Sequence, residues 1–112
     1  VLSNHKKKIK MKIIYVPGVF EIPYAISKNL KKYDAFIALG CVIKGETPHF
    51  DFISKSSIDA IMKLSIEYKK PIGNGILTCL NKDQAIERAD KSNKNKGKEA
   101  ANAAIELLIS DN

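Results

Sequence analysis

Apolar residues alternate between strand-like and helix-like patterns along the chain. The stretches 35–43 and 72–80 are apolar almost throughout, which is typical of strands buried on both faces of a parallel sheet. Residues 11–16 are rich in β-branched side chains and end at the turn signal Pro17-Gly18. The pattern therefore predicts three strands.

Amphipathic stretches follow each of these strands. They predict helices over residues 21–32, 48–70, 82–89 and 99–110. Pro23 suits the first turn of the first helix, and Asn81 and Gln84 form a capping-box signature before the third. Alternating strands and helices predict an α/β protein whose parallel sheet is covered by helices.

The second helix has the clearest pattern. Its core-facing residues recur at helical spacing: Phe50, Ile53, Ser57, Ile61, Leu64 and Tyr68. Thr47 is expected as its N-cap and Pro48 as its first residue, and Lys69-Lys70-Pro71 ends it. In the last helix, Ala100, Ala101, Ala103 and Ala104 favour close packing on a sheet or a neighbouring chain.

A chain of 112 residues suits a single domain over 1–112. No apolar stretch approaches the ~18 residues of a membrane helix, so no membrane association is expected. Cys41 and Cys79 lie in apolar stretches without metal or redox spacing, so both are expected in the core of a cytoplasmic protein. The chain does not begin with Met, and three strands are few for such a sheet, so an N-terminal βα unit is expected to be missing.

A formal net charge of +7 favours an anionic partner. The charge is concentrated in residues 5–12 and 90–99, which also suit an ordinary solvated surface. A nucleic-acid binder is disfavoured because aromatic residues do not interleave with these lysines. A phosphorylated small molecule remains as the favoured partner.

The segment 40–47 nearly matches the phosphate loop of nucleotide-hydrolysing enzymes. Glu46 occupies the lysine position of that motif and would repel nucleotide phosphates, which argues against a nucleotide hydrolase. Gly45, Glu46 and Thr47 nevertheless precede a long helix, whose N-terminal N–H groups favour a monophosphate supported by a cation from elsewhere. An ordinary glycine turn before a capped helix is the alternative.

His49 lies in the first turn of that helix, after the carboxyl end of a predicted parallel strand. Ligands of open α/β proteins bind at this end of the sheet. The positive end of a helix favours a neutral imidazole, which could shuttle protons beside a phosphate. A structural histidine is the alternative.

Four blocks of the sequence together resemble the lumazine synthase family. They are "VPGVFEIP" (16–23), "LGCVIKGETPHFDFI" (39–53), "PIGNGILT" (71–78) and "QAIERA" with "NKGKEAA" (84–101). The resemblance implies a flavodoxin-like, three-layer α/β/α sandwich. It also implies a cytoplasmic transferase of riboflavin biosynthesis that uses no cofactor and no metal. This enzyme condenses 5-amino-6-(ribitylamino)uracil with 3,4-dihydroxy-2-butanone 4-phosphate, releasing phosphate and water to give 6,7-dimethyl-8-ribityllumazine.

The resemblance also implies the roles of individual residues. His49 would transfer protons, and Arg88 would reach the phosphate from the adjacent subunit. The phosphate site would comprise Gly45, Glu46, Thr47, Arg88 and Lys96, and the ribityl and pyrimidine site would comprise Val19, Phe20, Glu21, Val42, Ile43, Lys44 and Asn74. The partners would be small-molecule substrates and further copies of the chain, with no nucleic acid and no membrane.

The sequence departs from the family pattern at three places. The chain begins after the strand–helix turn that carries the family's pyrimidine-stacking aromatic residue. Asn74 replaces a phenylalanine common in the family, and the 88–97 segment lacks the glycines of capsid-forming members. A pentamer is therefore expected rather than a capsid. A ligand-binding homologue without catalysis is the alternative to an enzyme.

Overall fold

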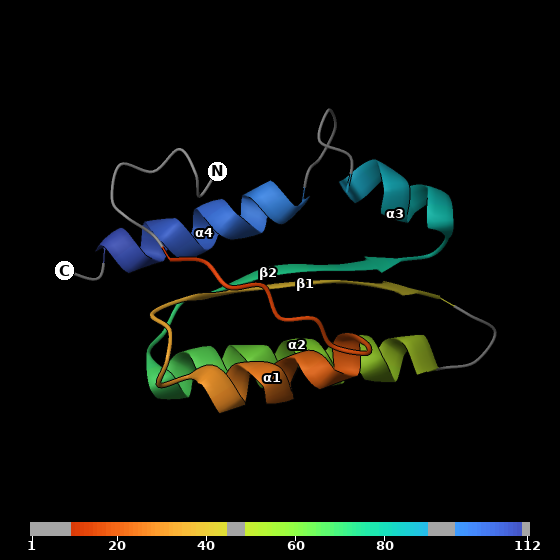
Figure 1. Ribbon diagram of the computed structural model, residues 1–112. Helices are drawn as coiled ribbons and strands as arrows, with labels where there is room; N and C mark the ends of the chain where they lie inside the picture. The colour runs from red at the N-terminus through yellow and green to blue at the C-terminus, as the bar shows by residue number, and fades with distance from the viewer. Residues whose placement is uncertain (1–9, 45–48, 90–95, 111–112) are drawn as a thin grey trace.

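The computed structural model describes residues 10–44, 49–89 and 96–110 of the chain. Its elements are η2 (Val19–Glu21), α1 (Ile22–Asn29), β1 (Phe36–Ile43), α2 (His49–Tyr68), β2 (Ile72–Cys79), α3 (Lys82–Ala89) and α4 (Lys96–Ser110). Helices α1 and α2 cover one face of the sheet, and α3 and α4 cover the other (Figure 1). The expected three-layer α/β/α arrangement with a parallel sheet is confirmed.

The sheet contains two strands among the described residues. β1 and β2 pair in parallel, from Phe36 opposite Ile72 to Ile43 opposite Cys79. Lys44 N–H donates to the Cys79 carbonyl at 2.8 Å, which fixes the end of β2 against the residue after β1. Two of the three predicted strands are thus confirmed.

The third predicted strand, over residues 11–16, is wrong. This segment pairs with neither β1 nor β2, and its side chains are largely in solvent, with Tyr15 89% exposed. β-branched composition favours an extended backbone, but a strand also needs a neighbouring strand to accept its ladder hydrogen bonds. Within the single chain, no described strand pairs with residues 11–16.

The core lies between α1, α2 and the sheet. Its buried members are Val19, Ile22, Ile26, Leu30, Ala38, Ile61 and Ile76. Ile61 comes from the predicted stripe of α2, and Pro23 occupies the first turn of α1 as expected. Gly40 matters here, because a Cβ at that position would lie 2.8 Å from Val19 Cγ2. Its missing side chain lets η2 sit directly on β1.

The connection between α2 and β2 is tied to the end of α1. Helix α2 ends at Tyr68, and Lys69 adopts a left-handed φ of 52° just before Lys70 and Pro71. Lys70 Nζ donates to the carbonyls of Leu30 and Tyr33, the latter at 2.9 Å. The ammonium therefore satisfies backbone acceptors after α1.

Helix α4 covers the opposite face of β2 so closely that the backbones of helix and strand nearly touch. A Cβ on Gly73 would lie 2.1 Å from the Ala100 carbonyl oxygen, and one on Gly75 would lie 3.3 Å from Ala100 Cβ. Ala100 and Ala104 are each 2% exposed. The alanines of the last helix thus pack closely on the sheet, as expected, although Ala103 faces solvent.

Strand β1 is less covered on this face than its apolar sequence predicts. Leu39 is 60% exposed and Ile43 is 45% exposed, because α4 packs chiefly on β2. Cys41 shares this uncovered face and is exposed, whereas Cys79 is buried. The prediction of two core cysteines is therefore wrong for Cys41 and confirmed for Cys79.

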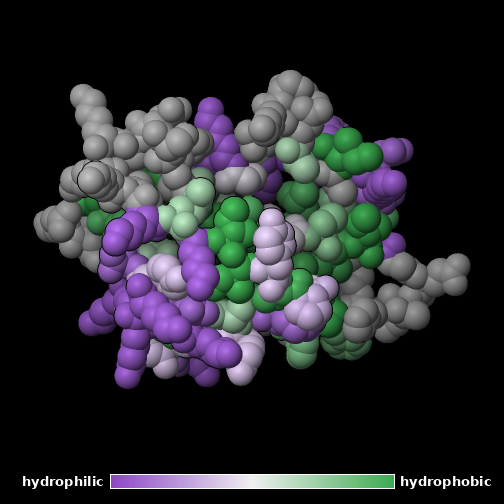
Figure 2. All heavy atoms as spheres, viewed as in Figure 1, coloured by the Kyte–Doolittle hydropathy of each residue, from purple (hydrophilic) through white to green (hydrophobic). Residues whose placement is uncertain are grey.

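Large apolar side chains also lie in solvent elsewhere on the chain. Figure 2 shows hydrophobic residues in the middle and at the right of one face, beside a hydrophilic region at the lower left. The exposed set includes Met11, Ile13, Tyr15, Phe20, Tyr24, Leu39, Phe52, Met62, Ile66 and Leu80. Apolar surface gathered on one face (Figure 2) is typical of protein interfaces. No helix in the described part of the chain is long and apolar enough to cross a membrane.

Candidate functional site

The carboxyl ends of β1 and β2 lie at the same end of the molecule as the start of α2 and the whole of α3 (Figure 1). This arrangement follows from parallel pairing, since the segment after each strand must leave from one edge of the sheet. Ligands of open α/β proteins bind at this edge. Most of the predicted site residues belong to the segments that meet here.

The predicted phosphate loop lies outside the described residues at Gly45, Glu46 and Thr47. Its two ends are described. Lys44 is held to the end of β2 by its backbone hydrogen bond to Cys79, and His49 is the first residue of α2. The backbone of His49 therefore stands at the N-terminus of a 20-residue helix, as the sequence predicts.

Helix α3 begins with a cap built from the predicted signature. Asn81 Oδ1 accepts from Gln84 N–H at 2.9 Å, and Gln84 Oε1 accepts from Leu80 N–H at 2.8 Å. The return bond goes to the residue before the N-cap rather than to the N-cap itself, a variation on the expected capping box. The cap fixes where α3 starts and therefore where Arg88, in its last turn, is located.

Arg88 reaches back from α3 to the end of β2. Its Nη1 donates to the Thr78 carbonyl at 2.9 Å and to Cys79 Sγ at 3.7 Å. Arg88 is the only arginine among the nineteen basic residues of the chain. A half-buried guanidinium fixed by two acceptors at the ligand-binding edge is suited to bind a phosphate.

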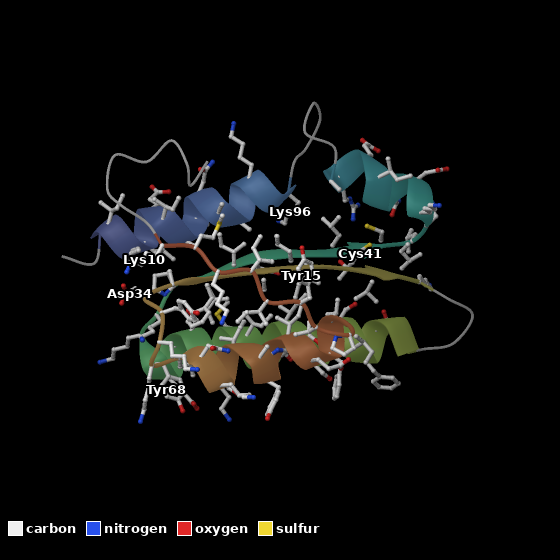
Figure 3. The ribbon with its side chains drawn as sticks, in the orientation of Figure 1. Lys10, Tyr15, Asp34, Cys41, Tyr68 and Lys96 are labelled. Carbon is white, nitrogen blue, oxygen red and sulfur yellow. The ribbon has the colours of Figure 1, made fainter. Side chains whose placement is uncertain are left out.

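Lys96 is the first residue of α4 and lies at the end of that helix nearest α3 (Figure 3). Its Nζ pairs with Glu99 Oε1 at 3.2 Å. A cation at a helix N-terminus is electrostatically unfavourable, and Glu99 in the first turn offsets that cost. Lys96 thus lies at the end of α4 that is nearest α3, the helix that carries Arg88 (Figure 3).

The predicted ribityl and pyrimidine residues are divided between core and surface. Val19 is buried in the core, whereas the Phe20 side chain is 61% exposed. Val42 packs partly against the core, and Ile43 and Lys44 are exposed at the carboxyl end of β1. Glu21 is half-buried at the start of α1.

Asn74 lies away from Arg88 within one chain. It is five residues before the end of β2, roughly 17 Å along an extended strand. Its Oδ1 accepts from the Ile76 N–H at 3.0 Å, and the residue is exposed. Asn74 and Arg88 therefore cannot meet the same small ligand inside a single chain.

Cys79 is a site contact that the sequence did not indicate. The apolar setting of Cys79 predicted only a core residue, and a sulfur acceptor for Arg88 has no sequence motif. Cys41 lies nearby on the side of the sheet covered by α3 and α4 (Figure 3). Partial burial raises the pKa of the Cys41 thiol, and the adjacent Cys79 adds to that shift.

The described residues contain no cluster of three or more His, Cys, Asp and Glu side chains that could hold a metal ion. The described part of the candidate site comprises the Arg88 guanidinium, the Cys79 thiol and Lys96, with the backbone of His49 at the start of α2.

Comparison with known proteins identifies relatives over nearly the whole chain. The profile of the 6,7-dimethyl-8-ribityllumazine synthase family matches residues 1–110. A 6,7-dimethyl-8-ribityllumazine synthase of Aliarcobacter butzleri is 49% identical over 98 residues, which are 86% of this chain and 63% of the relative. The Bartonella tribocorum enzyme of that name is 48% identical over 111 residues, 96% of this chain and 74% of the relative.

A third relative of the same name, from Campylobacter jejuni, is 43% identical over 109 residues, 96% of this chain and 71% of the relative. The chain thus spans between 63% and 74% of the length of these three relatives. The matches include the segments that carry Arg88, Lys96 and the start of α2. The chain belongs to the 6,7-dimethyl-8-ribityllumazine synthase family.

Proposed function

We propose that the protein is a lumazine synthase, a transferase of riboflavin biosynthesis. It condenses 5-amino-6-(ribitylamino)uracil with 3,4-dihydroxy-2-butanone 4-phosphate and releases phosphate and water. The observation that carries this proposal is Arg88, fixed by Thr78 and Cys79 at the ligand-binding edge of the sheet. Family membership supplies the identity of the substrates.

The reaction requires that the two substrates be oriented and that protons be transferred, and it does not require a strong nucleophile. An amine of the pyrimidine adds to the ketone carbonyl and water leaves to form an imine. Phosphate then leaves by elimination, and a second condensation closes the ring. Arg88 holds the phosphate of the four-carbon substrate, and His49 moves protons at the reacting carbon and nitrogen atoms.

The direct test is turnover with both substrates. We expect the full-length protein to release one inorganic phosphate for each 6,7-dimethyl-8-ribityllumazine formed, with the two products followed by phosphate assay and mass spectrometry. Binding of both substrates without product would identify a non-catalytic homologue instead. The free cysteines Cys41 and Cys79 suit the reducing cytoplasm, which is the location we propose.

Replacement of Arg88 by alanine tests the phosphate assignment. We expect Arg88→Ala to weaken binding of inorganic phosphate and of the butanone phosphate by about 1.5–3 kcal/mol, the scale of a hydrogen bond to a charged group. Calorimetric titration of each substrate measures the change. Binding of the pyrimidine should be nearly unchanged, and a loss of the pyrimidine with phosphate retained would reassign Arg88 to the other substrate.

We further propose that the active chain is a ring, most simply a pentamer. The exposed apolar residues of the single chain and the uncovered face of β1 support extensive contact with further copies. A head-to-tail contact must close into a ring or extend as a filament. In this proposal Arg88 and Lys96 serve the site that contains the His49 of the adjacent copy, so one site requires two chains.

Mixing two inactive variants tests the shared site. His49→Ala and Arg88→Ala chains, co-assembled in equal amounts, should recover about a quarter of the wild-type turnover, because that fraction of random neighbour pairs carries both intact residues. Light scattering reports the size of the mixed particle, and each variant assembled alone is the control. No recovery in mixed rings would mean that each site lies within one chain.

A further inference from the structure

Nη1 of Arg88 contacts two acceptors inside its own chain. It donates to the Thr78 carbonyl at 2.9 Å and to Cys79 Sγ at 3.7 Å, within hydrogen-bonding range for sulfur. Both acceptors belong to the last two residues of β2. The Nη1 atom of the guanidinium is therefore held by contacts within the chain that do not depend on a ligand.

This anchoring decides which edge of the guanidinium is left for an anion. A phosphate is bound in a two-bond contact either by Nη1 with Nη2 or by Nε with Nη2. The first pair would bring the phosphate to the nitrogen that already contacts Thr78 and Cys79. The second pair uses N–H groups that point away from Thr78 and Cys79, so the phosphate meets the Nε–Nη2 edge.

The acceptors are rigid. Cys79 is 1% exposed, and its carbonyl accepts from Lys44 N–H at 2.8 Å, so both the side chain and the backbone of this residue are fixed. A thiol is a weak acceptor. It can therefore orient a guanidinium without neutralising the positive charge that a phosphate needs.

We propose that Cys79 is a positioning residue of the phosphate site, whose thiol acts with the Thr78 carbonyl to turn the Nε–Nη2 edge of Arg88 toward the phosphate. The inference rests on the proposed function for the identity of the substrate, a phosphate monoester of a small ketone. It adds to that function the orientation of the arginine and the residue that sets it.

Nitrogen-15 NMR of the full-length protein tests the orientation. Arg88 is the only arginine of these 112 residues, and comparison with the Arg88→Ala variant identifies its Nε–H signal in the full-length protein. We expect this signal to shift in saturable fashion as inorganic phosphate is added. A signal that stays unchanged while phosphate binds, with Arg88→Ala abolishing that binding, would mean an end-on contact and would overturn the proposal.

Variants of Cys79 test the positioning role. Cys79→Val removes the acceptor at similar volume, and Cys79→Ser retains an acceptor. We expect the valine variant to bind phosphate about two- to tenfold more weakly, the value of one neutral hydrogen bond, and to raise KM for the butanone phosphate by that factor. KM for the pyrimidine should stay within about twofold, and Cys79→Ser should bind phosphate more tightly than Cys79→Val.

Cys41→Ser is the control for altering the other thiol on the same face of the sheet, since serine keeps a hydrogen-bonding group beside Cys79. It should leave phosphate binding unchanged. Wild-type affinity in Cys79→Val, or equal increases in both KM values, would overturn the proposal. If the valine variant does not fold, Cys79→Ala replaces it as the variant without an acceptor.

The outcomes separate this inference from the proposed function. A phosphate-dependent Nε–H shift that weakens in Cys79→Val, in a protein without turnover, would support the positioning role and refute the enzyme assignment. Turnover without any Nε–H response to phosphate would refute the positioning role alone.

Discussion

His49→Ala should lower kcat by about a hundredfold or more, within the range that general acid–base catalysis contributes. The backbone of this histidine begins α2, next to the carboxyl ends of the two strands (Figure 1), and the proposed role of its side chain is to accept and return a proton. Steady-state kinetics across pH 5 to 9 measure the change. Affinity for both substrates should change much less than turnover, because the expected role of His49 is to move protons.

The control is His5→Ala, the same substitution at the other histidine of the chain. It should leave kcat and its pH dependence unchanged. A His49→Ala protein that turns over at the wild-type rate throughout this pH range would remove His49 from the mechanism, and the proton would then have to be moved by another group or by water.

Gly73→Ala should destabilise the protein by about 3 kcal/mol or more, the upper range for overpacking a rigid interior. The added Cβ would lie 2.1 Å from the Ala100 carbonyl oxygen and 2.8 Å from its carbonyl carbon. These are backbone atoms of a helix, so they cannot move aside without shifting α4. Denaturant unfolding measures the loss, which is a large part of the 5–15 kcal/mol typical of a domain.

Gly18→Ala provides the matched control. A Cβ there would lie 3.4 Å from Glu21 Oε1, an ordinary contact with the end of a flexible side chain, and the extended backbone of Gly18 suits alanine. Its stability should stay within about 1 kcal/mol of wild type. Equal stabilities of the two variants would mean that α4 does not press on β2 as closely as the structure describes.

The sequence predicted the two paired strands and the four α-helices of the described residues, because each carries a local signal. The short helix η2 was not predicted. The stripe of α2, the cap at Asn81 and the alanines of α4 are patterns within a few residues. The strand expected over 11–16 failed because its formation depends on a neighbour that the local pattern cannot specify. For the same reason the exposure of Cys41 was missed, since it depends on how far α4 extends across β1.

The positions of two residues of the candidate site could be predicted from sequence motifs and from the parallel topology of the sheet. His49 lies where its motif and the parallel sheet predict, and Arg88 reaches the same edge. The contact between Arg88 and the Cys79 thiol could not be predicted, because it depends on how helix α3 is oriented relative to strand β2. The separation of Asn74 from Arg88 likewise follows from strand length and becomes visible only once the register is known.

The register of the sheet has a consequence for the order of folding. Each rung joins residues 36 positions apart, from Phe36 with Ile72 to Ile43 with Cys79. No rung can form until the whole crossover has folded back, and α2 forms much of that crossover from local contacts alone. Pairing over such a separation is slow compared with helix formation. We therefore expect the acceptors of Arg88, at the end of β2, to reach their final positions only after the chain between the two strands has folded back.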